Sequence, residues 1–412
     1  MGTNESRGIM TVSSIKKNIV LGLFAVLPAC SGGATSTDTS ADPTGGFRAT
    51  LPPSVADSDK LALQDTKIDY MLALRSAALK LTGNYPTLAE IKQLQSASDQ
   101  TAVYSQLIDN YINRPTFNQQ ILQFWRDTFK MGGMLPVSTP SGMVNVNLEV
   151  APTFAAYLIA KGENFTKLVN GTTGTCQTYN PATDTFTQAT CANTSAVGIL
   201  TDQGVQAQFF SALAFRRVRW FQEALLCSRF PAETNGAKVQ YTGGIYNSPW
   251  DMKSVSGAVN DPKALVDFQD TSSLICANCH STMNHQAPLF ANFGATGMYV
   301  AGAIQVQTPV AGNPTSKLVD WIPVNEPLSY RFGKPTPTLK DFGDAMASDP
   351  AFKSCMATRL WNWAMSRGDV VVDQATLTPD FEAQLTQQID ANNWNLKEYI
   401  RGVFKNPNFI RY

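Results

Sequence analysis

Hydrophobic residues recur at helical spacing in three stretches of the chain. In the first, residues 57–132, apolar side chains stand three or four positions apart and polar ones fill the positions between. Thr87 with Glu90 has the spacing of a capping box, and Pro115 is suited to the first turn of another helix. The apolar positions with this spacing include Ile68, Met71, Leu72, Leu79, Tyr104, Leu107, Ile108, Tyr111, Phe117, Ile121, Leu122, Trp125 and Phe129. This stretch is predicted to be helical.

The other two helical patterns lie further along the chain. One runs from about Thr201 to Cys227, and the last begins at Asp349, which is followed by a first-turn proline. Asn395 with Glu398 predicts a further helix start. The intervening Gly-, Pro- and Thr-rich stretches are predicted to be loops, with short strands at Met143–Leu148 and Ile304–Val310; these stretches are 133–150, 170–197, 231–273 and 300–338.

These patterns predict a mainly α protein built from three regions. Residues 57–197 would form a helical N-terminal unit, and residues 198–338 a helical unit with long irregular loops. Residues 339–412 would form a helical C-terminal unit. The sequence contains no internal repeat.

Residues 1–30 have the pattern of a bacterial export signal. Lys16 and Lys17 precede an apolar run over residues 19–27, with the start at Met1 or Met10. That run is shorter than the roughly 20 residues that span a bilayer.

The end of this signal resembles a lipobox, Leu27-Pro28-Ala29-Cys30. We expect Cys30 to be acylated, so that the protein is exported and lies on a membrane through a lipid anchor. Ser31 after the cysteine favours the outer membrane. Simple secretion, with cleavage after a small residue, is the alternative. Residues 31–56 would form a flexible tether, because their first part has almost nothing to bury.

Charge argues against some partners. The 32 basic side chains balance 32 acidic ones, and no basic run follows the signal. Binding to nucleic acid or to a membrane through a polybasic segment is therefore not expected.

The chain has seven cysteines, and four of them lie outside the lipobox and the Cys-x-x-Cys-His motif described next. An even number in an exported protein predicts disulfides. We expect Cys176 to pair with Cys191 across a polar loop and, by elimination, Cys227 with Cys355. Because Cys227 and Cys355 both lie in apolar helical patterns, buried free thiols are the alternative for them.

The motif Cys276-Ala277-Asn278-Cys279-His280 carries the strongest chemical signal. Two thiols at this spacing attach one haem c covalently through its vinyl groups, and the adjacent histidine becomes an axial ligand of the iron. A thioredoxin-like pair would need a βαβ context, which residues 262–300 do not show. A zinc site that also used His285 would have the wrong spacing, since His280 directly follows a cysteine.

The second iron ligand is less constrained. His285, the other histidine of the chain, is expected to stay on the side of His280. Met298 is the first choice for the distal position, and an open or water-bound iron is the alternative. The residues expected to form part of the apolar haem wall are Leu289, Phe290 and Phe293, and those considered for pairing with haem propionates are Arg216, Arg217 and Arg367.

The segment from Cys276 to Gly297 resembles the planctomycete- and myxobacterial-type haem-c proteins. Their pattern continues from Cys-x-x-Cys-His to a Glu-Asn-Phe-Asp-x-x-Gly ending, which Asn292, Phe293 and Gly297 match. Gly294 replaces the family's aspartate, and residues 284–287 replace its Asp-Pro-Ile-Gly-like turn. Weaker similarity covers parts of residues 81–87, 198–227, 352–367 and 406–409. The resemblance implies a haem and an architecture, but no substrate.

Together these features predict an exported mono-haem c-type lipoprotein that transfers electrons to or from an unknown redox partner. The haem would lie between the 201–227 helix and the C-terminal helices. One alternative is a haem oxidoreductase that acts on peroxide or oxygen at an open iron site. Another is a binding or structural lipoprotein in which the haem staples the fold.

Overall fold

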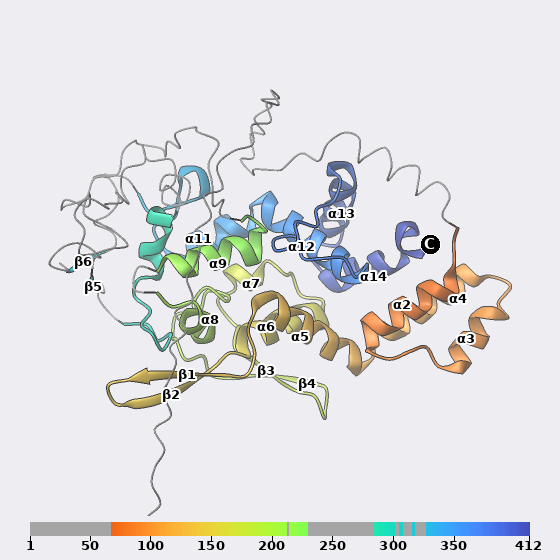
Figure 1. The fold of residues 1–412 in the computed structure, drawn as a ribbon, viewed down its shortest axis with the longest axis horizontal. Helices are drawn as coiled ribbons and strands as arrows, with labels where there is room; N and C mark the ends of the chain where they lie inside the picture. The colour runs from red at the N-terminus through yellow and green to blue at the C-terminus, as the bar shows by residue number, and fades with distance from the viewer. Residues whose placement is uncertain (1–66, 212–213, 230–282, 301–304, 308–314, 318–326) are drawn as a thin grey trace, which may run out of the picture. The chain divides into compact units, whose positions relative to one another are not determined.

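The computed structural model describes residues 67–211, 214–229, 283–300, 305–307, 315–317 and 327–412 (Figure 1). The fold is mainly helical, as predicted. The signal, the tether and the haem motif with Cys276, Cys279 and His280 lie outside the described residues, as does Cys30.

The first four described helices are α2 (Tyr70–Thr82), α3 (Leu88–Gln95), α4 (Gln100–Ile112) and α5 (Pro115–Phe129), of which α3 and α5 begin as predicted. The Asp69 side chain caps α2 by accepting hydrogen bonds from the amides of Met71 and Leu72. Thr87 and Glu90 form the capping box of α3, with both reciprocal hydrogen bonds present. Pro115 stands in the first turn of α5.

Two hairpins and two helices follow. Strand β1 (Met134–Thr139) pairs with β2 (Gly142–Asn147), and β3 (Gln177–Asn180) pairs with β4 (Thr185–Gln188). Helices α6 (Val150–Lys161) and α7 (Lys167–Asn170) lie between the hairpins in sequence. A strand was predicted near β2, but the loop prediction was wrong for β1, β3 and β4. Strands β3 and β4 are short and mostly exposed, so neither has the alternating apolar pattern by which a strand is recognised. Strand β1 does alternate exposed and half-buried positions, with Leu135 and Val137 against the core, but the exposed Met134 and Pro136 obscure this alternation in the sequence.

The middle of the chain supplies α8 (Gln203–Gln208), α9 (Phe215–Leu226) and a helical segment over residues 283–290. Beyond it, β5 (Gln305–Gln307) pairs with β6 (Thr315–Lys317). The β5 strand lies within one of the predicted β-prone pieces. A second small pair, β7 (Ser329–Tyr330) with β8 (Lys334–Pro335), flanks the 3₁₀ turn η3 (Arg331–Gly333).

The C-terminal helices are α11 (Leu339–Ala347), α12 (Pro350–Ala364), α13 (Pro379–Ala391), α14 (Leu396–Lys405) and α15 (Pro407–Ile410). The Asp349 side chain caps α12 ahead of Pro350, as predicted. Asn395 caps α14 by accepting from the amides of Lys397 and Glu398. Helices α12 and α14 therefore begin where the local sequence predicts.

One hydrophobic core runs through the described parts of all three predicted regions. Trp125 of α5 is completely buried and stacks on Phe165, with ring centres 5.3 Å apart. Tyr104 of α4 donates a hydrogen bond to the carbonyl oxygen of Phe404 in α14, across 300 positions of sequence. The division into three units stays a prediction.

The first and last described residues pair with each other, beside α2 (Figure 1). The Lys67 amide donates to the Tyr412 carbonyl oxygen, and the Tyr412 amide donates back, each at 3.1 Å. Ile68 and Arg411 form an antiparallel bridge. Helices α2 and α15 also pack together. The C-terminal residues thus complete the packing around the first described helix.

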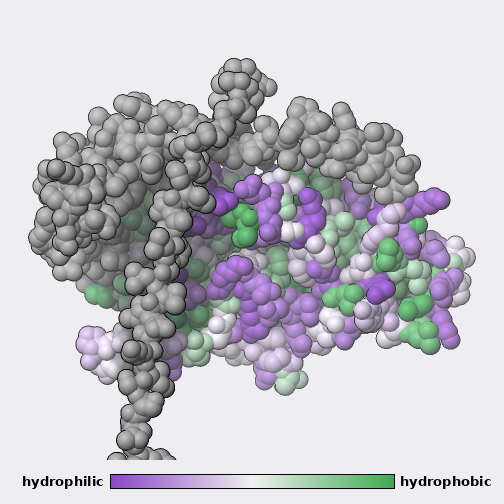
Figure 2. Space-filling model, viewed as in Figure 1, coloured by the Kyte–Doolittle hydropathy of each residue, from purple (hydrophilic) through white to green (hydrophobic). Residues whose placement is uncertain are grey.

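The described surface is mixed in character. Figure 2 shows hydrophilic residues over most of the coloured face, with hydrophobic ones scattered among them. Within the described ranges, the structure contains no helix that is long and apolar enough to cross a membrane.

Candidate functional site

The helical segment that follows the predicted haem motif is deeply buried. Its described part covers residues 283–290, of which the first stands three positions after His280 in the sequence. Its consecutive residues Asn284, His285, Gln286 and Ala287 are all buried. Four buried residues in a row show that this segment is enclosed by protein on every side rather than along one face.

Aromatic packing fixes the end of this segment. Phe290 is fully buried, stacks on Phe221 of α9 at 5.0 Å and contacts the edge of Phe342 of α11 at 5.6 Å. Phe293 is also buried and contacts Tyr299, whereas Leu289 is half-buried. These rings contact the protein's own aromatic residues, and their role in a haem wall stays a prediction.

Arg217 joins this segment to two helices. The side chain projects from α9, is 1% exposed and donates four hydrogen bonds to backbone carbonyl oxygens. Two reach Gln206 of α8 at 3.0 and 2.7 Å, one reaches Phe290 at 2.8 Å, and one reaches Gly294 at 3.1 Å. Burial lowers the pKa of Arg217 to about 9, which leaves it protonated at neutral pH.

This geometry corrects one sequence-based expectation. Four of the five N–H groups of Arg217 are committed to the protein's own carbonyl oxygens, so it is poorly placed to bind a haem propionate. Arg216 and Arg367 are exposed, and propionate pairing stays a prediction for them.

Buried amide groups lie on the same helical segment. Gln222 of α9 donates to the side-chain oxygen of Gln286 at 3.2 Å. The side-chain nitrogen of Gln286 is buried and has no hydrogen-bond partner among the described residues. A buried donor of this kind is suited to a group with acceptor oxygens, such as a haem propionate. In this respect the residues present fit the predicted cofactor.

A tight turn carries Met298. The Gly294 amide donates to the Met298 carbonyl oxygen at 2.9 Å, and Gly297 adopts a positive φ of 73°. A Cβ atom at Gly297 would overlap the carbonyl oxygen of Gln203, so glycine is required there by close approach to α8 as well as by conformation. Met298 is 38% exposed. Its role as the distal iron ligand stays a prediction.

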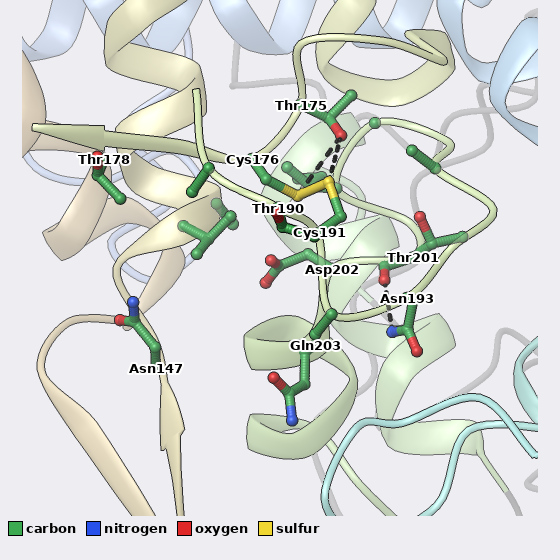
Figure 3. Close-up of a pocket in the computed structure, with 17 residues that line it drawn as sticks. Asn147, Thr175, Cys176, Thr178, Thr190, Cys191, Asn193, Thr201, Asp202 and Gln203 are labelled. Carbon is green, nitrogen blue, oxygen red and sulfur yellow. Dashed lines mark hydrogen bonds between the residues drawn. A yellow bond between two sulfur atoms is a disulfide. The ribbon is translucent and has the colours of Figure 1, made fainter. Parts of the chain in front are cut away.

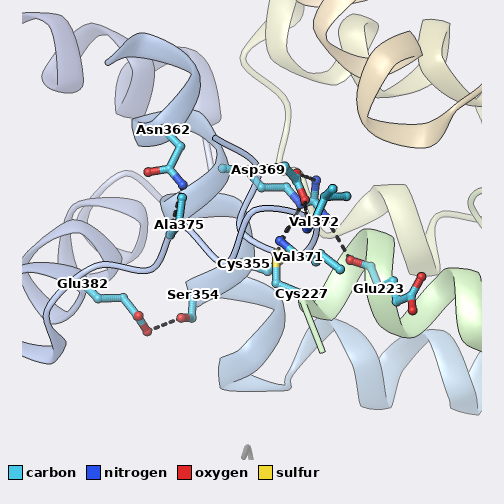
Figure 4. The surroundings of a disulfide bond; sticks show 11 residues. Glu223, Cys227, Ser354, Cys355, Asn362, Asp369, Val371, Val372, Ala375 and Glu382 are labelled. Atoms are coloured by element: carbon cyan, nitrogen blue, oxygen red, sulfur yellow. Dashed lines mark hydrogen bonds and ion pairs between the residues drawn. A yellow bond between two sulfur atoms is a disulfide. The ribbon is translucent and has the colours of Figure 1, made fainter. Parts of the chain in front are cut away.

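Both predicted cysteine pairs are at disulfide distance. The Cα atoms of Cys176 and Cys191 are 5.4 Å apart, and those of Cys227 and Cys355 are 5.2 Å apart. The second pair joins the end of α9 to α12 (Figure 4), which agrees with the predicted pairing rather than with free thiols. Arg359 is buried beside this pair and donates to the Cys227 sulfur at 3.2 Å, a contact that its place in the helical pattern did not predict.

A cavity of about 180 Å³ lies beside the Cys176–Cys191 disulfide (Figure 3). Its walls come from the end of β2, the start of α6, the disulfide loop and the start of α8. Asp202, the N-cap of α8, is 8% exposed and contributes its carboxylate to the wall. Sequence reasoning missed this site, because its residues are gathered from segments with no shared motif. Asp202 ahead of a short helix was recognisable as a cap, but not as a cavity residue.

The cavity wall is linked to the turn that carries Met298. The Asn193 side chain donates to the carbonyl oxygens of Thr201 and Gly297, and its oxygen accepts from the Tyr299 amide at 2.8 Å. Gln203 donates to the carbonyl oxygen of Thr296. Two wall residues therefore hold the segment that follows the predicted haem motif.

Comparisons with protein-family models, with curated proteins and with solved structures find no match to this chain. Among the described residues, no group of three or more His, Cys, Asp or Glu side chains is placed to hold a metal ion. His280, the predicted iron ligand, lies outside those residues.

Proposed function

We propose that this chain is an exported mono-haem c-type lipoprotein that transfers electrons. The observation that carries the proposal is the sequence Cys276-x-x-Cys279-His280, because two thiols and an adjacent histidine at this spacing are what covalent haem attachment requires. Covalently bound, the haem would supply a reversible one-electron step.

The chain's own residues support this role by holding the segment that follows the attachment motif at several points. Gln222 and Phe221 of α9 contact residues 286 and 290, and Arg217 binds the backbone at residues 290 and 294. A segment fixed at several points changes little in geometry when a nearby charge changes, which favours rapid electron transfer. The unpaired donor of Gln286 adds a group suited to a propionate oxygen.

Two features support export. The first 30 residues have the pattern of a signal with a lipobox, which assigns Cys30 to lipid attachment. In addition, two cysteine pairs are at disulfide distance, and disulfide bonds persist mainly in oxidising compartments outside the cytoplasm.

Haem attachment is tested by denaturing gel electrophoresis of protein made with the c-type maturation system. The wild-type protein should keep its haem through denaturation, and the Cys276→Ala, Cys279→Ala double variant should lose it. The matched control is Cys176→Ala with Cys191→Ala, which also removes two cysteines and should keep the haem. Loss of haem from the wild type under these conditions refutes the proposal.

Electron transfer is tested by the reactivity of the purified haem protein. A carrier should show a low-spin spectrum, should resist added cyanide or carbon monoxide, and should exchange electrons with soluble redox mediators. Rapid turnover of peroxide at an exchangeable iron would instead establish an oxidoreductase.

Lipid attachment is tested by labelling with a fatty acid during expression. The wild type should incorporate label and fractionate with membranes, whereas Cys30→Ser should incorporate no label and should either be soluble or keep its signal uncleaved. An unlabelled wild type in the soluble periplasmic fraction would show that Cys30 carries no lipid.

A further inference from the structure

The cavity beside the Cys176–Cys191 disulfide contains a single ionisable side chain in a neutral wall. Apart from the two disulfide-bonded cysteines, Asp202 is the only lining residue that can titrate. The wall is otherwise made of small apolar and uncharged polar side chains. Its uncharged polar members are Asn147, Thr175, Thr178, Thr190, Asn193, Thr201 and Gln203.

Within the described residues, the Asp202 carboxylate is paired only with backbone amides. Its side chain accepts hydrogen bonds from the Val205 amide at 2.8 Å and from the Gly204 amide, both within its own helix. Among the described residues, no cation and no side-chain donor pairs with it. Burying an ionised carboxylate without a cationic partner is costly, and the two amides offset only part of that cost, so a cation in the cavity would stabilise the ionised form.

Neighbouring elements do not supply the missing charge. Strands β1 and β2 and helix α6 pack against α8, and within the described residues none of them places an ionisable side chain in the cavity wall. Glu149, just before α6, is occupied by Arg126 at 2.8 Å and by the Gly133 amide at 2.7 Å. A cation in the cavity would therefore have no cationic side chain of the described wall competing with it for Asp202.

We infer that this cavity binds a small organic ammonium ion, with Asp202 as the anionic partner. The size agrees, because a cavity of about 150 Å³ accommodates a molecule as large as benzene. The composition favours an ammonium ion over a metal ion, since the wall offers one carboxylate and several apolar side chains such as Val150 and Ile199. Uncharged hydroxyl and amide groups around the carboxylate can accept the remaining N–H donors. The inference is independent of the proposed haem.

Burial also gives the site a pH dependence. It raises the pKa of Asp202 to about 7, although the amides of Val205 and Gly204 oppose the shift. An ammonium ion requires the ionised carboxylate. Affinity should therefore fall as the pH drops, by about 100-fold between about pH 8 and about pH 5.

The test is calorimetric titration of the full mature protein with n-propylammonium chloride. The neutral 1-propanol and the anionic propionate serve as ligands of similar size. The wild type should bind the ammonium ion and neither control. Asp202→Asn should weaken binding at least tenfold and abolish its pH dependence, because asparagine keeps the helix cap but removes the charge.

Two further variants complete the experiment. Asp99→Asn makes the same change at the exposed cap of α4 and should bind like the wild type. Ala196→Leu, in the cavity wall, should block binding while leaving Asp202 in place. Circular dichroism checks that each variant is folded. The inference is overturned if the wild type binds no propylammonium, if 1-propanol binds equally well, or if folded Asp202→Asn binds as tightly as the wild type.

Discussion

Replacing Arg217 with methionine tests whether this buried cation holds residues 290–294, which follow the predicted haem motif, against α8 and α9. The substitution removes four hydrogen bonds. The carbonyl oxygens of Phe290 and Gly294 keep a partner, because they also accept from the amides of Phe293 and Gly297. The Gln206 carbonyl oxygen receives two of the four bonds and has no other donor among the described residues.

These contacts set the expected magnitude. An orphaned buried carbonyl costs about 1–3 kcal/mol, and each of the other two lost bonds costs about 0.5–1.5 kcal/mol. Methionine also removes a buried charge that has no counterion, and this regains part of the lost free energy of unfolding. We expect Arg217→Met to lower the free energy of unfolding by about 3 kcal/mol. Amide exchange should accelerate in residues 290–299, where two of the acceptors lie.

The assay is guanidinium unfolding followed by far-ultraviolet circular dichroism, with hydrogen exchange on the same samples. Arg219→Met is the matched control, because Arg219 lies on the same helix, is 61% exposed and pairs with Glu223 four residues on. An exposed pair of this kind contributes about 0.5 kcal/mol or less. If Arg217→Met is as stable as the control, or more stable, the hydrogen bonds from Arg217 to the carbonyl oxygens do not stabilise the fold.

Three other outcomes are expected. Replacing Cys227 and Cys355 with alanine should lower the free energy of unfolding by about 5 kcal/mol, because the unfolded chain gains entropy, and the same change at Cys176 and Cys191 should lower it by about 3 kcal/mol. Denaturant unfolding of both double variants measures the difference. Because folding raises the pKa of Asp202, the contribution of this side chain to the free energy of unfolding should fall by about 1.4 kcal/mol per unit as the pH rises from about 4 to about 7. Asp202→Asn should remove that slope in urea unfolding at a series of pH values. In the haem protein, Met298→Ala should convert the iron to high spin and abolish the far-red sulfur band; an unchanged spectrum excludes Met298 as a ligand.

Helix starts could be predicted from the sequence because their causes are local. Thr87 and Glu90 are three residues apart, and their two reciprocal hydrogen bonds need no other part of the chain. Asp349 before Pro350 is similar. The Cys176–Cys191 pairing was also accessible, because both residues flank one polar loop. The haem motif is equally local, and its geometry stays a prediction because it lies outside the described residues.

Tertiary contacts explain what the sequence did not reveal. Arg217 stands among Arg216 and Arg219, a pattern typical of a solvated face. However, it precedes Phe221 by four positions and Ala224 by seven, which places it on the buried face of α9, and this spacing was a usable signal. For the cavity the sequence carried no comparable signal, because residues distant in sequence meet there only after folding.

The pairing of the two ends of the described fold has a consequence for how the protein is made. Helix α2 packs against α15 and helix α4 packs against α14, so these two described helices need partners that lie about 300 positions later in the sequence. Loop closure over such separations is slow, and the N-terminal helices keep apolar surface uncovered until it occurs.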